Sequence, residues 1–209
     1  MKGYLITFEG PEGSGKTTVM KRLAEYLELK GYNVIKTREP GGTVISEKIR
    51  GIILDINHKE MAPETEALLY AASRTQHIVE VIKPNIEKGN IILCDRYLDS
   101  SLVYQGYARG LGIEKVLEIN KYAVENALPD LTIFFDIKPR IGLNRIKDNH
   151  RVQDRLDLEK LEFHDKVYMG YRTICDIFTD RIKIVNAEND QDTVYNDVQD
   201  LICKFLEKK

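Results

Sequence analysis

The stretch FEGPEGSGKTT, residues 8–18, constrains the fold more than any other part of the chain. Gly10, Gly15, Lys16 and Thr17 satisfy the pattern G-x-x-x-x-G-K-[ST], which stands between a strand-like run and a helical pattern. In such a P-loop the glycines let backbone N–H groups converge on phosphate oxygens, and the start of the helix adds its dipole. Lys16 can then reach the terminal phosphates, and Thr17 can ligate Mg²⁺. The stretch therefore predicts a nucleoside triphosphate site.

The rest of the chain alternates short β-branched or aromatic runs with longer helical patterns. This alternation predicts an α/β fold, in which a parallel sheet is covered by helices on both faces. The expected strands are residues 4–9, 33–38, 91–95, 131–136 and 182–186. The expected helices are residues 16–30, 43–55, 64–88 with an interruption near Pro84, 113–127, 139–148, 157–178 and 190–207.

Length, charge and cysteine usage argue against several classes of protein. A chain of 209 residues suits one domain, 1–209, and no apolar run approaches the ~20 residues that cross a bilayer. The net charge of -2 argues against a dedicated nucleic-acid binder. The N-terminus MKGYLITFEG is unlike a cleavable signal, so we expect a cytoplasmic protein. Cys94, Cys175 and Cys203 lack CxxC or CxxH spacing, which indicates neither a disulfide framework nor a zinc site.

Two further strand-like runs end in charged side chains. TREPGGT places Arg38 at the carboxyl end of 33–38, and LCDRY places Asp95 and Arg96 at the end of 91–95. Open α/β sheets bind ligands at that edge, where arginines can hold a phosphate and an aspartate can hold Mg²⁺. Arg50, on the following helix, could reach the same anion. The simpler alternatives are solvated surface arginines and a structural Asp–Arg pair.

A second group of residues is suited to binding a base. Tyr70 and Arg74 lie four residues apart in ETEALLYAASRTQH and therefore share a helix face. Their ring and guanidinium could stack on a base and hydrogen-bond its edge, although a packed tyrosine beside an exposed arginine is the more ordinary arrangement. The stretch DSSLVYQG, 99–106, adds short polar groups and one ring, a set suited to a small heterocycle: Ser100, Ser101, Tyr104 and Gln105.

The segment RIKDNHRVQDRLD, 145–157, is nearly all polar and rich in arginine, and it lies between two helical patterns. Exposed segments of this charge often close over anions. The pattern predicts a short arginine-rich lid.

Taken together, FEGPEGSGKTT, TREPGGT, EALLYAASRTQH, CDRYLDSSLVYQGYARG and DRLD resemble the bacterial thymidylate kinases, in order and over nearly the whole chain. The resemblance implies a P-loop NTPase fold whose five-stranded parallel sheet has the order 2-3-1-4-5. It also implies Mg²⁺-dependent transfer of the γ-phosphoryl group of ATP to dTMP, which gives dTDP in dTTP synthesis. Members of this family are usually homodimers.

The resemblance implies a role for each matching position. Arg38 and Arg96, with Arg50, would hold the dTMP phosphate, and Tyr70 would stack on thymine. The whole dTMP site would comprise Glu12, Arg38, Arg50, Tyr70, Arg74, Arg96, Ser100, Ser101, Tyr104 and Gln105. ATP would be bound by Gly10, Pro11, Glu12, Gly13, Ser14, Gly15, Lys16, Thr17 and Thr18.

Finer roles follow from the same resemblance. Arg74, Ser101 and Gln105 would read the polar edge of thymine. Tyr104 would lie beneath the 2′ carbon of the sugar. Glu12 would hydrogen-bond the 3′-hydroxyl, with a solvated loop carboxylate as the alternative.

Catalysis would depend on alignment and charge neutralisation, because the attacking phosphate oxygen is already anionic. In one subclass of the family a basic residue follows the acidic residue of the P-loop, but this chain has Gly13 there, so the lid is expected to supply the missing charge. Arg151 and Arg155 are the lid candidates, and Arg145 is the third. Thr17 and Asp95 would hold the metal. The implied catalytic set is Lys16, Asp95, Arg96, Arg151 and Arg155.

Other P-loop proteins are alternatives that the P-loop alone does not separate. A GTPase normally carries N-K-x-D for guanine, but the Asn-Lys of this chain, NKYA at 120–123, has Ala123 in place of the aspartate. Two alternative functions remain. One is a P-loop kinase that acts on a nucleoside or on another monophosphate, and the other is a regulatory or nucleic-acid-coupled ATPase.

Overall fold

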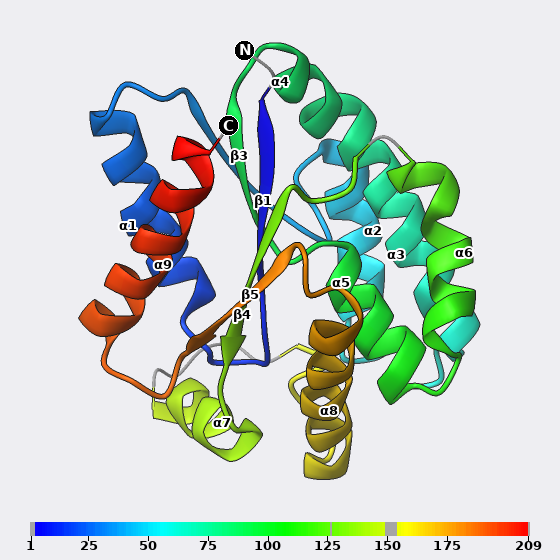
Figure 1. Ribbon diagram of the computed structural model, residues 1–209. Helices are drawn as coiled ribbons and strands as arrows, with labels where there is room; N and C mark the ends of the chain where they lie inside the picture. Colours follow the sequence, from blue (N-terminus) through cyan, green and yellow to red (C-terminus); the bar gives the residue numbers. More distant parts are fainter. Residues whose placement is uncertain (1–2, 126, 149–153, 209) are drawn as a thin grey trace.

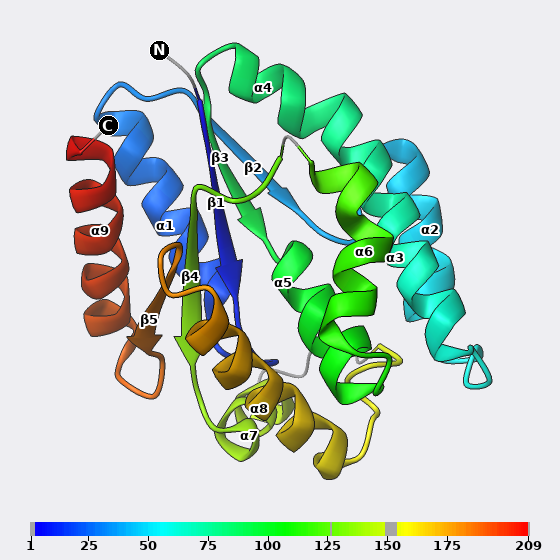
Figure 2. The ribbon, with the colours of Figure 1, turned by 45° about the vertical axis from the view of Figure 1, so that its right-hand side comes forward.

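Five parallel strands form one sheet in the order β2-β3-β1-β4-β5 in the computed structural model of the protein (Figure 1; β2 is labelled in Figure 2). The structure describes residues 3–125, 127–148 and 154–208. The order implied by the family resemblance is confirmed, and β1 lies at the centre, so the P-loop leaves the middle of the sheet. The strands are β1 (Tyr4–Glu9), β2 (Val34–Arg38), β3 (Ile91–Asp95), β4 (Leu131–Asp136) and β5 (Ile182–Asn186).

Helices cover both faces of the sheet, as the alternating pattern predicts (Figure 1, Figure 2). On one face lie α1 (Lys16–Leu29) and α9 (Gln191–Glu207). The other side carries α2 (Val44–Leu54), α3 (Pro63–His77), α6 (Ile113–Val124) and α8 (Leu161–Ile177). Within the described residues, no helix is both long and apolar enough for a membrane crossing.

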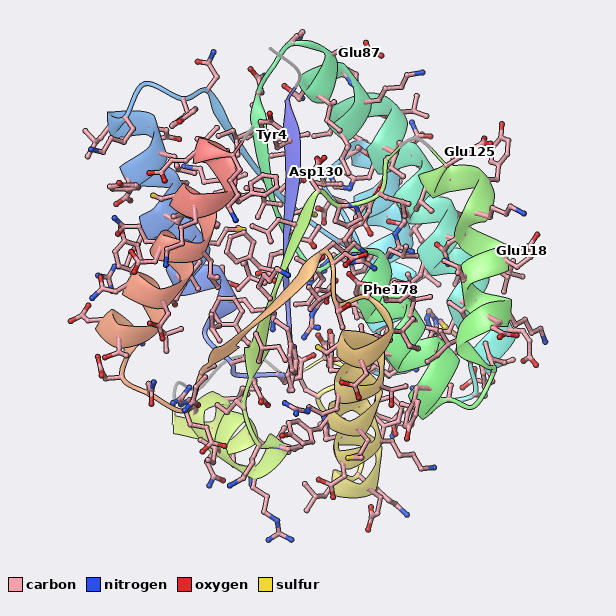
Figure 3. The ribbon with its side chains drawn as sticks, viewed as in Figure 1. Tyr4, Glu87, Glu118, Glu125, Asp130 and Phe178 are labelled. Carbon is pink, nitrogen blue, oxygen red and sulfur yellow. The ribbon has the colours of Figure 1, made fainter. Side chains whose placement is uncertain are left out.

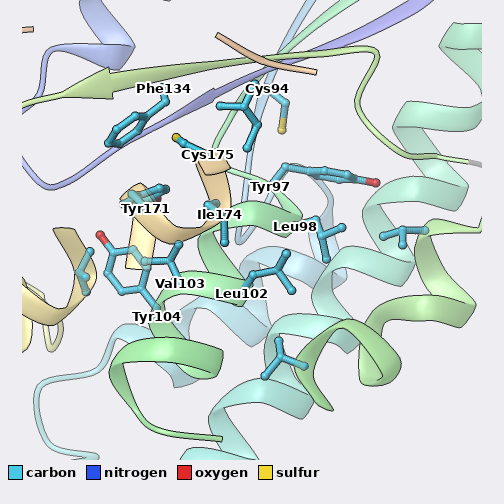
Figure 4. Close-up of a cluster of buried hydrophobic side chains, with 14 of the residues drawn as sticks. Cys94, Tyr97, Leu98, Leu102, Val103, Tyr104, Phe134, Tyr171, Ile174 and Cys175 are labelled. Atoms are coloured by element: carbon cyan, nitrogen blue, oxygen red, sulfur yellow. The ribbon is translucent and has the colours of Figure 1, made fainter. Parts of the chain in front are cut away.

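Alternate residues of the central strands enter two separate hydrophobic cores. Phe134 joins the core that includes α8, whereas its neighbour Phe135 joins the core beneath α1 and α9. Strand side chains alternate and both faces are covered, so the strand LTIFFD is apolar along most of its length. Phe134 stacks on Tyr171 of α8 with 5.1 Å between ring centroids (Figure 4). This stacking holds the Tyr171 ring against the sheet.

The strand ends opposite the P-loop are also fixed by a specific contact. Asp130, labelled in Figure 3, accepts a hydrogen bond from the N–H of Leu5 at 2.9 Å. The bond ties the approach to β4 to the start of β1. It helps to set the level at which both strands end at the opposite edge, where the ligand site lies.

The helical pattern predicted over 64–88 is interrupted close to Pro84, as expected. α3 continues into a π-helical segment, η1 (Ile78–Ile82), which leads into α4 (Lys83–Glu87). A proline in a helix lacks the N–H donor, and its ring clashes with the carbonyl four residues earlier. The wider turn immediately before Pro84 accommodates both defects.

Two sequence expectations need correction around the site. The helix predicted over 157–178 begins only at Leu161, because the preceding residues form a turn in which the Asp154 carboxylate accepts from the N–H groups of Leu156 and Asp157. Residues 98–108, not predicted as helix, form α5 (Leu98–Ser101) and the π-helical η2 (Leu102–Ala108). Outside these segments, element boundaries agree within three residues.

The predicted lid is only partly within the described residues. Its first four residues belong to α7 (Pro139–Asp148), and description resumes at Asp154. The expectation of an exposed segment is wrong for Arg155 and Leu156, which are buried. Arg151 lies outside the described residues, so its catalytic assignment stays a prediction.

Candidate active site

The carboxyl ends of three neighbouring strands bring the predicted site residues together. Asp95 at the end of β3 lies in register with Arg38 of β2 and with Phe8 of β1. A cavity of about 390 Å³ opens at this edge, a size typical of small-molecule sites. Its lining includes much of the P-loop and the predicted acceptor residues Arg38, Arg50, Tyr70, Arg74, Asp95, Arg96, Ser100, Tyr104 and Gln105.

The P-loop wraps around the amine of Lys16. Gly10, Gly13 and Gly15 have φ values of 147°, 70° and 88°, a region that side-chain-bearing residues rarely adopt. The Lys16 amine donates to the carbonyls of Gly10 and Pro11 and to the Ser14 hydroxyl, each at 3.0 Å. Burial, followed by the nearby Arg96, lowers the pKa of Lys16 to about 8. A bound phosphate would favour the charged amine and draw it out of this loop.

Thr17 and Asp95 form the predicted metal-binding pair. The Thr17 hydroxyl donates to the Asp95 carboxylate at 2.5 Å, and both residues line the cavity. Hydroxyl and carboxylate oxygens are the hard ligands that Mg²⁺ prefers, and Mg²⁺ needs few of them because it keeps several waters. The described residues hold no cluster of three or more His, Cys, Asp or Glu side chains that could bind a metal. The donor set therefore fits Mg²⁺ held together with substrate phosphates.

Arg96 lies at the junction of the P-loop and the acceptor pocket. Its backbone has a φ of 66°, in the left-handed region that costs free energy for a residue other than glycine. One guanidinium nitrogen donates to the Gly10 carbonyl at 3.0 Å and to the hydroxyls of Ser100 and Tyr171. The other donates to the Glu12 carboxylate at 2.7 Å. The side chain is thus held in one orientation from both sides.

Sequence analysis missed Glu9, the buried carboxylate beneath Arg96. One of its oxygens accepts from the N–H groups of Tyr97 and Ser100, and the other accepts from the hydroxyls of Ser100 and Tyr171 at 2.6 and 2.9 Å. Burial, and next the Asp99 carboxylate, raise the pKa of Glu9 to about 7. Its position as the last residue of β1 was the available signal, since strand ends also indicated Arg38 and Asp95.

Glu12 points out of the P-loop towards the acceptor side. Its carboxylate accepts from Arg96 at 2.7 Å and from the Tyr104 hydroxyl at 3.0 Å. The simple alternative of a solvated loop carboxylate is therefore wrong for this structure. Contact of Glu12 with a sugar hydroxyl stays a prediction.

The base-binding candidates lie deeper in the cavity. Arg74 is only 1% exposed, so the alternative of an exposed arginine is also wrong. Its guanidinium donates to Glu39 at 2.8 Å, to Asn120, and to the Ser101 hydroxyl at 3.1 Å. Sequence analysis missed Glu39 and Asn120. Tyr70 is buried too, and that burial raises its pKa well above the usual range, so its hydroxyl stays neutral.

Arg38 and Arg50 line the outer part of the cavity. Arg38 pairs with Glu47 at 2.9 Å, and Arg50 donates to the Pro40 carbonyl at 2.8 Å. Burial, and next the nearby Arg38 charge, lower the pKa of Arg50. Two positive side chains held so close that they repel each other are typical of an anion-binding site.

The two described lid arginines differ in position. Arg145 lines the cavity and donates to the Ala187 carbonyl at 2.9 Å. Arg155 instead donates to the Ile53 carbonyl at 2.8 Å and pairs with buried Glu66. Arg155 is thus held in a structural pair beside the cavity, and its catalytic role stays a prediction.

The cavity combines a phosphate-binding loop with a neighbouring pocket that suits a small anion carrying a ring. Lys16 and the P-loop form one part, and the arginines at the ends of β2 and β3 form the part beside it. Phosphoryl transfer requires such an arrangement, since donor and acceptor phosphates must approach each other despite their charge. The fold and the site define a P-loop kinase of small molecules.

Comparison with known proteins identifies the branch of these kinases. The family model described as thymidylate kinase matches residues 8–198. The chain is 53% identical to the thymidylate kinase of Oceanobacillus iheyensis over 100% of this chain and 93% of that protein. It is 51% identical to that of Bacillus licheniformis, over 100% and 99% of the two chains. The crystal structure of thymidylate kinase from Ehrlichia chaffeensis matches with a TM-score of 0.78 at 30% identity, covering 97% of this chain and 99% of that one.

This chain therefore belongs to the thymidylate kinase family, and the resemblance inferred from the sequence motifs is confirmed. It is a phosphotransferase with the P-loop NTPase fold. The reaction of the family is the ATP-dependent phosphorylation of dTMP to dTDP.

Proposed function

We propose that this chain carries out that reaction by binding ATP on the P-loop and dTMP in the adjoining cavity. The observation that carries the proposal is the Arg96–Glu12 contact of 2.7 Å, which joins an acceptor-side arginine to the donor loop. Arg96, Arg38 and Arg50 would hold the dTMP phosphate next to the γ-phosphate of ATP. The acceptor oxygen is already anionic, so no general base is needed.

Catalysis in this arrangement consists of alignment and charge neutralisation. Lys16 would move from the carbonyls of its own loop to the terminal phosphates, and Arg145 would add a charge from α7. We propose Mg²⁺ as the metal, held by Thr17 and Asp95. When bound, it would neutralise negative charge on the phosphates that it contacts.

The inner cavity would bind the nucleoside. Tyr70 would stack on thymine, while Arg74 and Gln105, which line the cavity, would face its polar edge. Ser101 is buried behind this lining and accepts a hydrogen bond from Arg74, so it would act through that arginine. Tyr104, whose hydroxyl donates to Glu12, would lie against the sugar. Ser100 lines the cavity as well, but its hydroxyl already donates to Glu9 at 2.6 Å. It would act mainly by holding Arg96.

An acceptor panel tests the proposed function. ADP release is measured with ATP and each of dTMP, thymidine, UMP and CMP. We expect strong turnover with dTMP alone. Equal turnover of another acceptor would favour a different nucleoside or nucleotide kinase, and acceptor-independent hydrolysis would favour a regulatory ATPase.

We expect Glu12→Gln to reduce discrimination between dTMP and its 3′-deoxy analogue. The variant keeps the size of the side chain but replaces the charged carboxylate, which would accept a hydrogen bond from the 3′-hydroxyl, by a neutral amide. Loss of one such charge-assisted hydrogen bond should lower the ratio of the two kcat/KM values about tenfold. Glu64→Gln, an equal charge change at an exposed position of α3, is the matched control. An unchanged ratio in Glu12→Gln would refute the contact.

We also propose that the chain, 1–209, forms one domain and acts as a cytoplasmic homodimer without nucleic-acid or membrane partners. One sheet with a core on each face supports a single domain. The free thiols of Cys94, Cys175 and Cys203 suit a reducing compartment. α2, α3 and α6 pack side by side and expose apolar side chains that a second copy could cover: Val44, Ile45, Ile52, Leu68 and Leu117. Sedimentation at micromolar concentration distinguishes monomer from dimer.

A further inference from the structure

Glu66 is a fully buried carboxylate of α3 to which the proposed reaction assigns no role. One of its oxygens accepts from the Gln105 amide nitrogen at 2.8 Å, and the other accepts from Arg155. Arg109 donates to both oxygens at 3.4 Å and pairs with Glu159 at 2.6 Å. Glu66 thus connects the end of the lid with a residue of the base pocket.

The two arginines keep Glu66 ionised. Burial alone would raise the pKa of Glu66, but the charge of Arg109 and the hydrogen bonds from Gln105 and Arg155 outweigh it and leave that pKa below its usual value. An ionised carboxylate has only acceptor atoms. Every group that faces Glu66 must therefore present a donor.

This requirement fixes the orientation of the Gln105 amide. The NH₂ group of Gln105 must face Glu66, because turning the amide over would place its carbonyl oxygen against the carboxylate. Gln105 is 1% exposed and lines the cavity, and its Oε1 is buried with no hydrogen-bond partner among the described residues. Unpartnered buried oxygens are rare in folded proteins and call for an explanation. The protein encloses this oxygen in the present structure, so a donor on the base would become its partner as the pocket adjusts around the bound nucleotide.

We propose that Glu66 is a specificity-determining positioning residue, which acts through Gln105. By holding the amide nitrogen, it presents Gln105 Oε1 to the base as an obligatory acceptor. Thymine carries an N–H at ring position 3 and can donate to it, whereas cytosine has a bare acceptor nitrogen at that position. Two facing acceptors leave both desolvated and unpaired, which penalises cytosine. The inference rests on the proposed placement of Gln105 at the base edge.

Arg155 gains a role in this scheme. It comes from the turn at the end of the lid, and its contact with Glu66 helps to keep the carboxylate charged. A protonated Glu66 could donate a hydrogen bond, which would allow the amide of Gln105 to turn over. The lid-derived arginine that resembled a catalytic group would then support base selection.

A double-mutant cycle tests the inference. Selectivity is the kcat/KM of dTMP divided by that of dCMP, measured for wild type, Glu66→Gln, Gln105→Ala and the double variant. We expect Glu66→Gln to lower selectivity at least about tenfold and to raise the KM of dTMP, while kcat at saturating dTMP changes less than about threefold. In the Gln105→Ala background, Glu66→Gln should leave selectivity unchanged within about twofold, because its effect passes through Gln105.

Glu159→Gln is the matched control, since it makes the same charge change at the other carboxylate partner of Arg109. It should leave selectivity at the wild-type value. Should thermal melting show that Glu66→Gln does not fold, Glu66→Asp replaces it; this variant keeps the charge but withdraws it from Gln105, and it should also lower selectivity.

The possible failures are distinguishable. If Gln105→Ala retains full selectivity, Gln105 does not read the base, and the proposed base site itself is overturned. If Gln105→Ala loses selectivity but the folded Glu66 variants keep it, or if dCMP turnover stays undetectable in them, the role of Glu66 is overturned. Additive effects in the double variant would likewise contradict action through Gln105.

Discussion

Arg96→Ala is expected to lower kcat for phosphorylation of dTMP by about a hundredfold to a thousandfold. Arg96 lies between the P-loop and the neighbouring pocket, where negative charge would build up as the two phosphates of the proposed reaction approach each other. KM for dTMP should rise less, because Arg38 and Arg50 would still hold the acceptor phosphate. Steady-state kinetics with ATP and dTMP, followed by single-turnover measurements, separate the chemical step from product release.

Two variants make the result interpretable. Arg96→Lys keeps a positive charge and the same strained backbone position but loses the planar fork, so it should recover only part of the lost rate. Arg172→Ala removes an arginine from a half-exposed surface pair with Asp136 and should leave kcat unchanged. A kcat for Arg96→Ala close to that of wild type, with the fold confirmed by thermal melting, would show that Arg96 does not act in the transition state.

The sheet and the residues at its ligand edge were predictable because their signals are local. Each strand is a short apolar run, and the P-loop pattern stands directly between β1 and α1. Once parallel strands are assumed, their carboxyl ends must share one edge, so Arg38 and Asp95 fall beside each other without any three-dimensional information. Strand-end reasoning therefore found the outer half of the site.

The hydrogen-bond partners of the buried carboxylates that support the site were not predictable in the same way. Glu9 is bonded to Tyr171, 162 residues further along the chain, and Glu66 to Arg155, 89 residues away. No local pattern marks such partners, because their meeting depends on how α3 and α8 pack. Arg155 is an example. The arginine-rich sequence around it indicated a catalytic group, whereas in the structure its side chain pairs with Glu66. Its role is therefore better judged from packing than from local charge.

Gly142→Ala is expected to lower kcat by about tenfold to a hundredfold, because it would push α7 away from the P-loop. A Cβ at Gly142 would lie 2.1 Å from the carbonyl oxygen of Glu12, and a Cβ at Gly13 would lie 2.1 Å from the carbonyl oxygen of Gly142. Neither backbone atom can yield without moving its element. Arg145, one turn further along α7, would move with the helix and leave its place in the lining of the cavity, where the phosphates would bind.

The same substitution should stabilise α7 while it lowers kcat. This contrast makes the prediction specific. Replacing glycine by alanine inside a helix favours helix formation by roughly 1 kcal/mol, so α7 alone should become more stable. A fall in kcat, measured beside thermal melting, therefore reports the lost contact with the P-loop and not an unfolded helix. Asn144→Ala, at an exposed position of the same helix, should leave kcat unchanged. Wild-type kcat in Gly142→Ala would mean that close packing of α7 on Glu12 and Gly13 is not needed for phosphoryl transfer.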